Sequence, residues 1–200
     1  MATAVPTDAD AAGRLIAAAR QCPRLHLGCG TNVMPGWVNV DDLEAPGVVS
    51  WDLRKPLPLA DGSIEYIFAE HFIEHILVAE AEALLRVCRR LLKPGGVLRL
   101  STPDLRWLIW KYLTRGLKEW RDVGWLPGTP CGLLNEGMRS WGHHYLYDKA
   151  ELAGLIERAG FPKPVSVRWR KSKHHALHNL ECRPYHRELI FEATAPHPTG

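Results

Sequence analysis

The sequence predicts an α/β domain of the Rossmann-like type, in which a mostly parallel sheet carries helices on both faces and an antiparallel C-terminal strand pair. Three observations predict this class. An apolar run breaks at a glycine pair over 25–30, short apolar runs that end in acids follow it, and segments of strand and helix character then alternate. A length of 200 residues suits one core, so we expect a single domain over 1–200.

The first part of the chain supplies one helix and four strands. Helical spacing of apolar residues predicts an amphipathic helix over 8–20, which Pro23 ends. Because only eleven positions separate Gly30 from Asp41, the usual full helix between the first two strands does not fit. The strands themselves are expected over 25–27, 37–40, 48–51 and 64–69.

The second part alternates helix and strand and contains one irregular stretch. The run 93–96 (Lys-Pro-Gly-Gly) stops a helix, and Asp148 with Glu151 forms a capping box that starts another. Residues 124–142 are loop-like because they are rich in glycine and proline. We expect helices over 78–92, 105–120 and 148–160, a strand over 97–102, and an antiparallel pair over 164–169 and 189–194.

The composition is that of an ordinary globular chain, with 46% apolar and 24% charged residues and a net charge of +3. No apolar run approaches the roughly 18 residues of a membrane span, and Asp8 and Asp10 stand where a signal peptide would carry positive charge. We therefore expect a cytoplasmic protein without a membrane partner. Five scattered cysteines without a C-x-x-C pair are typical of reduced thiols.

Residues suited to a nucleotide-like ligand gather where the expected strands end. Gly28 and Gly30 let a ligand lie against the main chain, and Asp41 and Asp52 each end an apolar run. Because acids at the carboxyl ends of parallel strands point into the ligand crevice of such folds, we expect these residues in one site. Cys29 lies inside the glycine turn, where a small side chain packed under the loop is favoured over a nucleophile.

Several motifs together resemble the class I S-adenosylmethionine-dependent methyltransferases, in particular the small type 11 group. The resemblance covers roughly residues 24–195. It rests on the order and spacing of Leu27-Gly28-Cys29-Gly30, Asp41, Asp52, the run 58–67 (Pro-Leu-Ala-Asp-Gly-Ser-Ile-Glu-Tyr-Ile), Glu74-His75, the run 91–98 (Leu-Leu-Lys-Pro-Gly-Gly-Val-Leu), the run 147–152 (Tyr-Asp-Lys-Ala-Glu-Leu) and Ala159-Gly160-Phe161.

The resemblance implies an enzyme that uses S-adenosyl-L-methionine and releases S-adenosyl-L-homocysteine. A carboxylate such as Asp41 suits the ribose because its two oxygens can face two vicinal hydroxyls. The implied cofactor contacts are Leu27, Gly28, Cys29 and Gly30 for the methionine part, Asp41 for the ribose, Asp52 with Leu53 for the adenine, and Glu70 and His71 at the end of the fourth strand.

The chain departs from the family pattern in two places. Family members usually carry an acid second in the glycine motif, where this chain has His26, so a contact to the ammonium end of the cofactor is in doubt. The short connection from Gly30 to Asp41 makes this a trimmed version of the fold, which leaves the cofactor more exposed at that edge.

Methyl transfer needs an acceptor aligned with an already activated sulfonium, and a base only where the acceptor must lose a proton. His71, after the fourth strand, and His143, next to His144, are our candidate catalytic residues. A packing or positioning role is the alternative for both, and we interpret His75 as structural. The expected partner is a small organic acceptor, with oxygen as the first guess for the accepting atom.

The segment 105–145 is the most individual part of the chain. It concentrates the aromatic residues Trp107, Trp110, Tyr112, Trp120, Trp125 and Trp141. Our hypothesis is a substrate lid with aromatic walls. Packing of an extra helix and a homodimer surface are the alternatives.

The segment 163–187 carries seven lysines and arginines against one acid. A solvated surface hairpin is the favoured interpretation, and an anionic small molecule is an alternative. Nucleic acid is disfavoured because basic and aromatic residues do not interleave here as on single-strand stacking platforms. His174, His175, His178 and Cys182 match no usual zinc spacing, so no metal is expected.

Two other functions are alternatives to the methyltransferase. A non-catalytic cofactor-binding partner or regulatory subunit would fit the short connection and the missing motif acid, whereas Asp41, Asp52 and His71 favour the enzyme. An NAD-dependent oxidoreductase would need G-x-G-x-x-G, and Val33 stands at the position of the last glycine.

Overall fold

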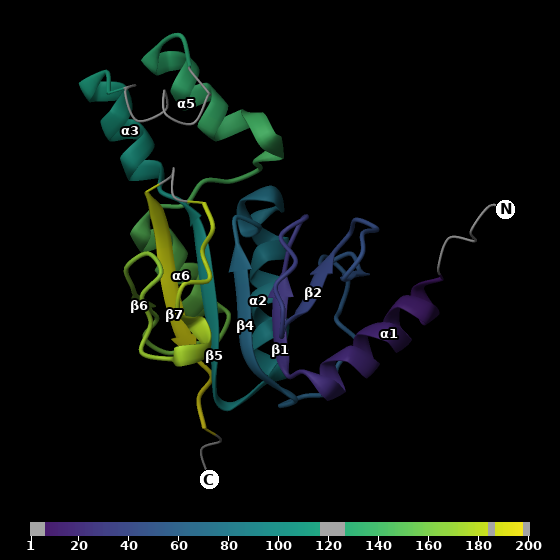
Figure 1. The fold of residues 1–200 in the computed structure, drawn as a ribbon. Coiled ribbons are helices and arrows are strands. Elements are labelled where there is room, and N and C mark those ends of the chain that lie inside the picture. Colours follow the sequence, from purple (N-terminus) through teal and green to yellow (C-terminus); the bar gives the residue numbers. More distant parts are fainter. Residues whose placement is uncertain (1–6, 117–126, 184–186, 198–200) are drawn as a thin grey trace, which may run out of the picture.

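In the computed structural model, which describes residues 7–116, 127–183 and 187–197, seven strands form one sheet (Figure 1). Their order across the sheet is β3-β2-β1-β4-β5-β7-β6. In chain order they are β1 (Arg24–Leu27), β2 (Val38–Asp41), β3 (Val48–Ser50), β4 (Ile64–Glu70), β5 (Leu92–Pro103), β6 (Val165–Ser166) and β7 (Glu188–Thr194). Neighbours from β3 to β5 are parallel, and β7 is antiparallel to β5 and β6, which confirms the predicted sheet.

The parallel register brings the ends of three strands to one edge of the sheet. Leu27 of β1 pairs with Val40 of β2 on one side and with Ala69 of β4 on the other. The turn after β1 therefore meets Asp41 and Glu70, the last residues of β2 and β4, at the carboxyl edge. This is the edge where α/β folds bind their ligands.

Three of the described helices cover one face of the sheet. α1, α2 and α6 place Leu15, Leu84 and Ile156 in one apolar core with Leu25 and Leu98 of the sheet. Figure 1 shows α2 and α6 behind the sheet. The described α-helices are α1 (Asp8–Gln21), α2 (Val78–Leu91), α3 (Leu105–Thr114), α5 (Pro130–Arg139) and α6 (Lys149–Arg158).

Part of the opposite face is covered by residues 167–183, which include the 3₁₀ helix η3 (His175–Leu177). Arg99 of β5 points to this face, because successive side chains alternate along a strand, and it is fully buried. Its guanidinium donates to Glu181 and Glu192, at 2.5 Å each, and to the carbonyl of Lys171 at 2.9 Å. This ion cluster ties the covering segment to the sheet.

The connection from β1 to β2 forms turns over 31–37 and no helix, as its length predicted. The buried Asn39 holds it: the side chain accepts from the Met34 amide at 2.9 Å and donates to the carbonyls of Met34 and Trp37 at 3.1 and 3.2 Å. Asn39 Oδ1 also lies 3.0 Å from Nδ1 of the buried His26. His26 is thus part of the scaffold of this short connection.

The prediction of a loop over 124–142 is wrong for its central part, where α5 forms. Thr129 caps this helix and accepts from the Gly132 amide at 3.0 Å. The helix packs on α3, where a Cβ on Gly137 would lie only 2.8 Å from Leu108. The missing side chain of Gly137 therefore permits a close helix–helix contact. Figure 1 shows α3 and α5 together beyond the carboxyl edge of the sheet.

Two further boundaries follow from pairing and capping. β5 begins directly after α2, at the start of the run expected to separate them, because Leu92 pairs with Ile64 of β4. Asp148 caps α6 as predicted and accepts from the Glu151 amide at 2.8 Å. None of the described helices is long and apolar enough to cross a membrane.

Candidate active site

A cavity of about 330 Å³ opens at the carboxyl edge of the sheet. It is lined by residues at the ends of β1, β2 and β4, in the turn after β3 and in the segment between β6 and β7. Its lining residues are Gly28, Gly30, Asp41, Asp42, Asp52, Leu53, Arg54, His71, Phe72, His75, Ile76 and Arg183. Gly28, Gly30, Asp41, Asp52, Leu53 and His71, all predicted from the sequence, are therefore brought together here.

The glycine turn is shaped by its backbone and by one aromatic ring. Gly28 and Gly30 adopt φ values of +64° and +53°, the left-handed region that favours glycine. A Cβ on Gly28 would lie 2.3 Å from Phe72. Phe72 thus packs directly on the turn, and the position accepts no side chain in this arrangement. Sequence reasoning did not single out Phe72.

Asp41 organises the acidic side of the cavity. Its Oδ2 accepts from the Gly30 amide at 2.7 Å, and its Oδ1 lies 3.4 Å from the Leu43 amide. A hydrogen bond to Asp41 raises the pKa of Asp42, because the two carboxyl groups lie side by side. The carboxylate of Asp41 retains lone pairs that can accept from hydroxyl groups of a ligand.

Asp52 is held in place by Arg54. Arg54 Nε and Nη2 lie 2.8 and 3.0 Å from its two oxygens, and the Arg54 amide donates to Oδ1 at 2.9 Å. These bonds lower the pKa of Asp52. The following residue, Leu53, is buried and adds an apolar surface to the same part of the cavity.

The side chains of His26 and Cys29, two residues of the glycine motif, face the protein interior. Burial raises the pKa of the Cys29 thiol to about 12, which leaves no reactive thiolate at neutral pH and supports the packing interpretation. Burial lowers the pKa of His26, which stacks on Phe68 at 5.2 Å. Neither side chain lines the cavity. His26 stands at the position where family members usually carry an acid.

Glu70 is buried behind the cavity and is not among its lining residues. Its Oε1 accepts from the amides of Cys182 and Arg183 at 2.9 and 3.1 Å, and Cys182 Sγ donates to Oε2 at 3.1 Å. Glu70 therefore fixes the loop that brings Arg183 to the cavity. The sequence does not single out Arg183, because the pattern of the basic segment favours a solvated hairpin.

His71 links two buried acids. It adopts a left-handed backbone conformation with φ +52°, and its Nδ1 and Nε2 lie 3.4 Å from Glu74 Oε1 and 3.1 Å from Glu188 Oε1. Burial raises the pKa of Glu74 to about 7 and that of Glu188 to about 9. The structure thus holds an acid–imidazole–acid chain under the cavity floor.

A second cavity, of about 230 Å³, adjoins the first and shares His71, His75 and Arg183 with it. His143 and Trp141 line its outer part, with Pro103. The structure therefore places His143, a candidate catalytic residue from the sequence, at the second cavity. Trp120 and Trp125 lie outside the described residues.

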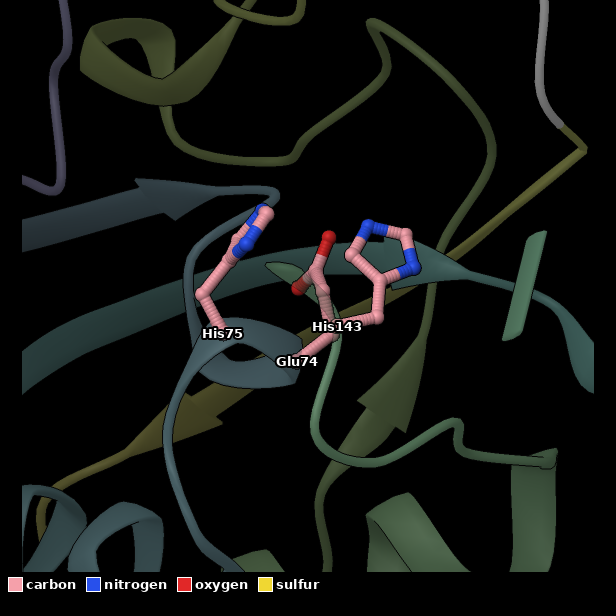
Figure 2. A group of neighbouring side chains, drawn as sticks. All are labelled: Glu74, His75 and His143. Atoms are coloured by element: carbon pink, nitrogen blue, oxygen red, sulfur yellow. The ribbon is translucent and has the colours of Figure 1, made fainter. Parts of the chain in front are cut away.

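Figure 2 shows the group of side chains here that could hold a metal ion: Glu74, His75 and His143. One nitrogen or oxygen atom from each lies within 4.8 Å of the other two. The rings of His75 and His143 meet edge to face at 4.8 Å. Sequence reasoning considered a metal only at the distant histidines of the basic segment.

Comparison with known proteins agrees with this geometry. Residues 11–163 match the family model of a methyltransferase domain, and no curated protein matches the chain. A SAM-dependent methyltransferase from Archaeoglobus fulgidus is similar over 91% of this chain and 90% of that chain, with a TM-score of 0.56 and 15% identity.

Two further solved structures have the same fold. One, from Thermotoga maritima, is described as a SAM-dependent methyltransferase and possible histamine N-methyltransferase; it covers 86% of this chain and 81% of its own, with a TM-score of 0.55 and 19% identity. The other is phosphoethanolamine N-methyltransferase 2 from Haemonchus contortus, bound to S-adenosyl-L-methionine, which covers 87% and 48%, with a TM-score of 0.54 and 15% identity. The chain belongs to the methyltransferase domain family, and its fold is that of the class I S-adenosylmethionine-dependent methyltransferases.

Proposed function

We propose that this methyltransferase transfers the methyl group of S-adenosylmethionine to an oxygen atom of a small organic acceptor. The observation that supports the proposal best is the pair of adjoining cavities, which meet at His71, His75 and Arg183. The first holds the glycine turn and the carboxylates that suit the cofactor. The second, walled by Trp141 and His143, has room for a small acceptor beside it.

We assign the cofactor to the first cavity by the chemistry of its walls. The carboxylate of Asp41 suits the two ribose hydroxyls, and the buried Leu53 offers an apolar contact to the adenine ring. Glu70 acts on the cofactor side through the loop that it fixes. The proposed contacts are the backbone of Leu27, Gly28, Cys29 and Gly30 for the methionine part, because the side chains of Leu27 and Cys29 are buried. Asp41 is the proposed contact for the ribose, and Asp52 with Leu53 for the adenine.

The transfer is an in-line displacement at the methyl carbon. The acceptor oxygen forms a bond to the methyl group, the carbon–sulfur bond breaks, and its electron pair stays on sulfur. The acceptor proton must leave during the reaction, and His143 and His71 are the proposed catalytic side chains. His143 lines only the acceptor cavity, whereas His71 lines both and is oriented by Glu74 and Glu188.

We propose that the segment 105–145 covers the acceptor as a lid. Trp141 supports this role, because it lines the acceptor cavity and contacts the His143 ring at 5.7 Å. The α3–α5 pair also exposes large apolar side chains, including Trp110 and Leu113. Such side chains could close over an organic acceptor.

The proposal is tested by binding and turnover on the full chain. S-adenosylhomocysteine is titrated calorimetrically, and the protein is then incubated with S-adenosylmethionine and matched phenols, alcohols and amines, with products identified by mass spectrometry. We expect methylated phenols or alcohols. Methylation of amines alone would contradict the oxygen assignment, and binding without any turnover would favour a non-catalytic partner.

Gly28→Ala tests the contact between the glycine turn and Phe72. We expect the new methyl group to push Phe72 into the cofactor cavity, with a loss of about tenfold in affinity for S-adenosylhomocysteine and about 1–3 kcal/mol of stability. Gly62→Ala is the matched control, because Gly62 has nearly the same φ, +62°, but open space around its Cβ position. Equal affinities for the two variants in the titration would contradict the steric explanation.

A further inference from the structure

Glu74, His75 and His143 form a cluster of possible metal ligands beside the acceptor cavity. Glu74 and His75 belong to the 3₁₀ helix η1 (Ile73–His75), and His143 directly follows the 3₁₀ helix η2 (Ser140–Gly142). Figure 2 shows the Glu74 carboxylate between the two imidazole rings. From this arrangement we infer that the three side chains form a binding site for a zinc ion at the acceptor cavity.

The Glu74 carboxylate is buried and only partly satisfied. Its Oε2 accepts from the Thr102 hydroxyl at 3.0 Å. Its Oε1 has only the ion-pair contact to His71 Nδ1, at 3.4 Å, and accepts no hydrogen bond from the described residues. A buried carboxylate oxygen without a donor is costly unless a cation or proton compensates it.

The imidazole ring of His143 has the outer contact that metal-ligating histidines use. His143 Nδ1 lies 2.8 Å from the Gly137 carbonyl, so this nitrogen donates and Nε2 keeps a free lone pair. His75 is packed against the same segment, with its ring 4.8 Å from the His143 ring. Donation of one ring nitrogen to a carbonyl fixes the ring and makes the other nitrogen a better ligand.

The backbone holds the two parts of the site together. The Glu74 carbonyl accepts from the amides of His144 and Tyr145, at 2.7 and 3.2 Å. The segment that carries His143 is therefore tied to the helix that carries Glu74 and His75. The backbone therefore keeps the three side chains close together, and a small inward movement of the ligand atoms would complete the site when the ion binds.

The surrounding charge also favours a cation. Burial raises the pKa of Glu188, and the nearby carboxyl groups of Glu70, Glu181 and Glu74 raise it further. Arg183 is the described arginine that lines both cavities, and it is exposed. A divalent ion at Glu74 would offset this excess of buried carboxyl groups.

The ligand set selects the metal and its role. Two histidines and one carboxylate form the three-ligand set of catalytic zinc sites, which keep one position open for substrate. That position would face the acceptor cavity, which His75 and His143 line. This part of the inference rests on the proposed function: zinc would hold the acceptor hydroxyl and lower its pKa. The proton then passes to water, the oxygen takes the methyl group, and His143 serves as a ligand rather than as a base.

Zinc binding to the metal-free full chain tests the inference. A chromophoric chelator competes for zinc, and cobalt(II) serves as a spectroscopic probe, because visible bands report coordination by histidine and carboxylate. We expect one equivalent of zinc. His143→Ala and Glu74→Gln should each weaken binding by about tenfold or more and change the cobalt bands.

The matched control is His144→Ala, which removes an exposed neighbouring imidazole and should leave zinc affinity unchanged. Unchanged binding in His143→Ala, or a loss in the control instead, would overturn the site. Titration of S-adenosylhomocysteine into each metal-free variant checks folding. If the wild type binds S-adenosylhomocysteine but no zinc, only the zinc inference fails; if zinc binds without S-adenosylhomocysteine, the proposed function fails.

Discussion

Asp41→Asn is expected to weaken binding of S-adenosylhomocysteine by about ten- to a hundredfold, the loss of one or two charge-assisted hydrogen bonds. The amide oxygen of asparagine can still accept from the Gly30 amide, the contact that Asp41 makes at 2.7 Å. The glycine turn should therefore keep its shape. The loss of affinity would then report the bonds between the carboxylate and the ribose hydroxyls.

Asp41→Ala separates the two roles of this side chain. It removes both the ligand contacts and the bond to Gly30, so we expect a larger loss of affinity and a lower melting temperature. Glu44→Gln is the matched control, since Glu44 is an exposed acid nearby that does not line the cavity. Calorimetric titration of S-adenosylhomocysteine into the three variants measures these affinities. Wild-type affinity in Asp41→Asn would contradict the assignment of this acid to the ribose.

The cofactor side of the site could be predicted from the sequence because its residues are local to strand ends. Asp41 ends β2, and Gly28 follows β1, so an apolar run and the next residue are enough to place each of them. Parallel pairing then brings the ends together without further information. The position of His143 cannot be predicted from local sequence, because the loop that carries it lies far along the chain and folds back onto η1.

Two segments, α5 and the loop that carries Arg183, could not be predicted from the local sequence pattern. α5 forms because Thr129 caps it and because Gly137 lets it approach Leu108 of α3, and only the second helix reveals the use of that glycine. Arg183 reaches the cavity because Glu70, distant in sequence, binds its amide at 3.1 Å. Such contacts depend on tertiary structure and leave no periodic signal.

Arg99→Met is expected to destabilise the protein by about 3–5 kcal/mol, because it leaves the carboxyl groups of Glu181 and Glu192 buried without their cation. The guanidinium and both carboxylate side chains have at most 6% of their surface exposed. Denaturant unfolding measures the change. Arg86→Met is the matched control: Arg86 pairs with Glu82 at 2.6 Å on the surface, where such pairs contribute about 0–1 kcal/mol.

Arg99→Met should also impair the active site, because it releases the loop that carries Arg183. Glu181 precedes Cys182 and Arg183, and it also accepts from the Arg170 amide at 3.0 Å, so it anchors the loop that Glu70 fixes. Arg99→Met combined with Glu181→Leu and Glu192→Leu removes the unpaired charges and should recover most of the stability. The loop that carries Arg183 would still lack its ionic anchor. If the triple variant recovers stability but not methyl transfer, the ion cluster serves to position this loop. If Arg99→Met loses no more stability than Arg86→Met, the ion cluster does not hold the sheet and the loop together.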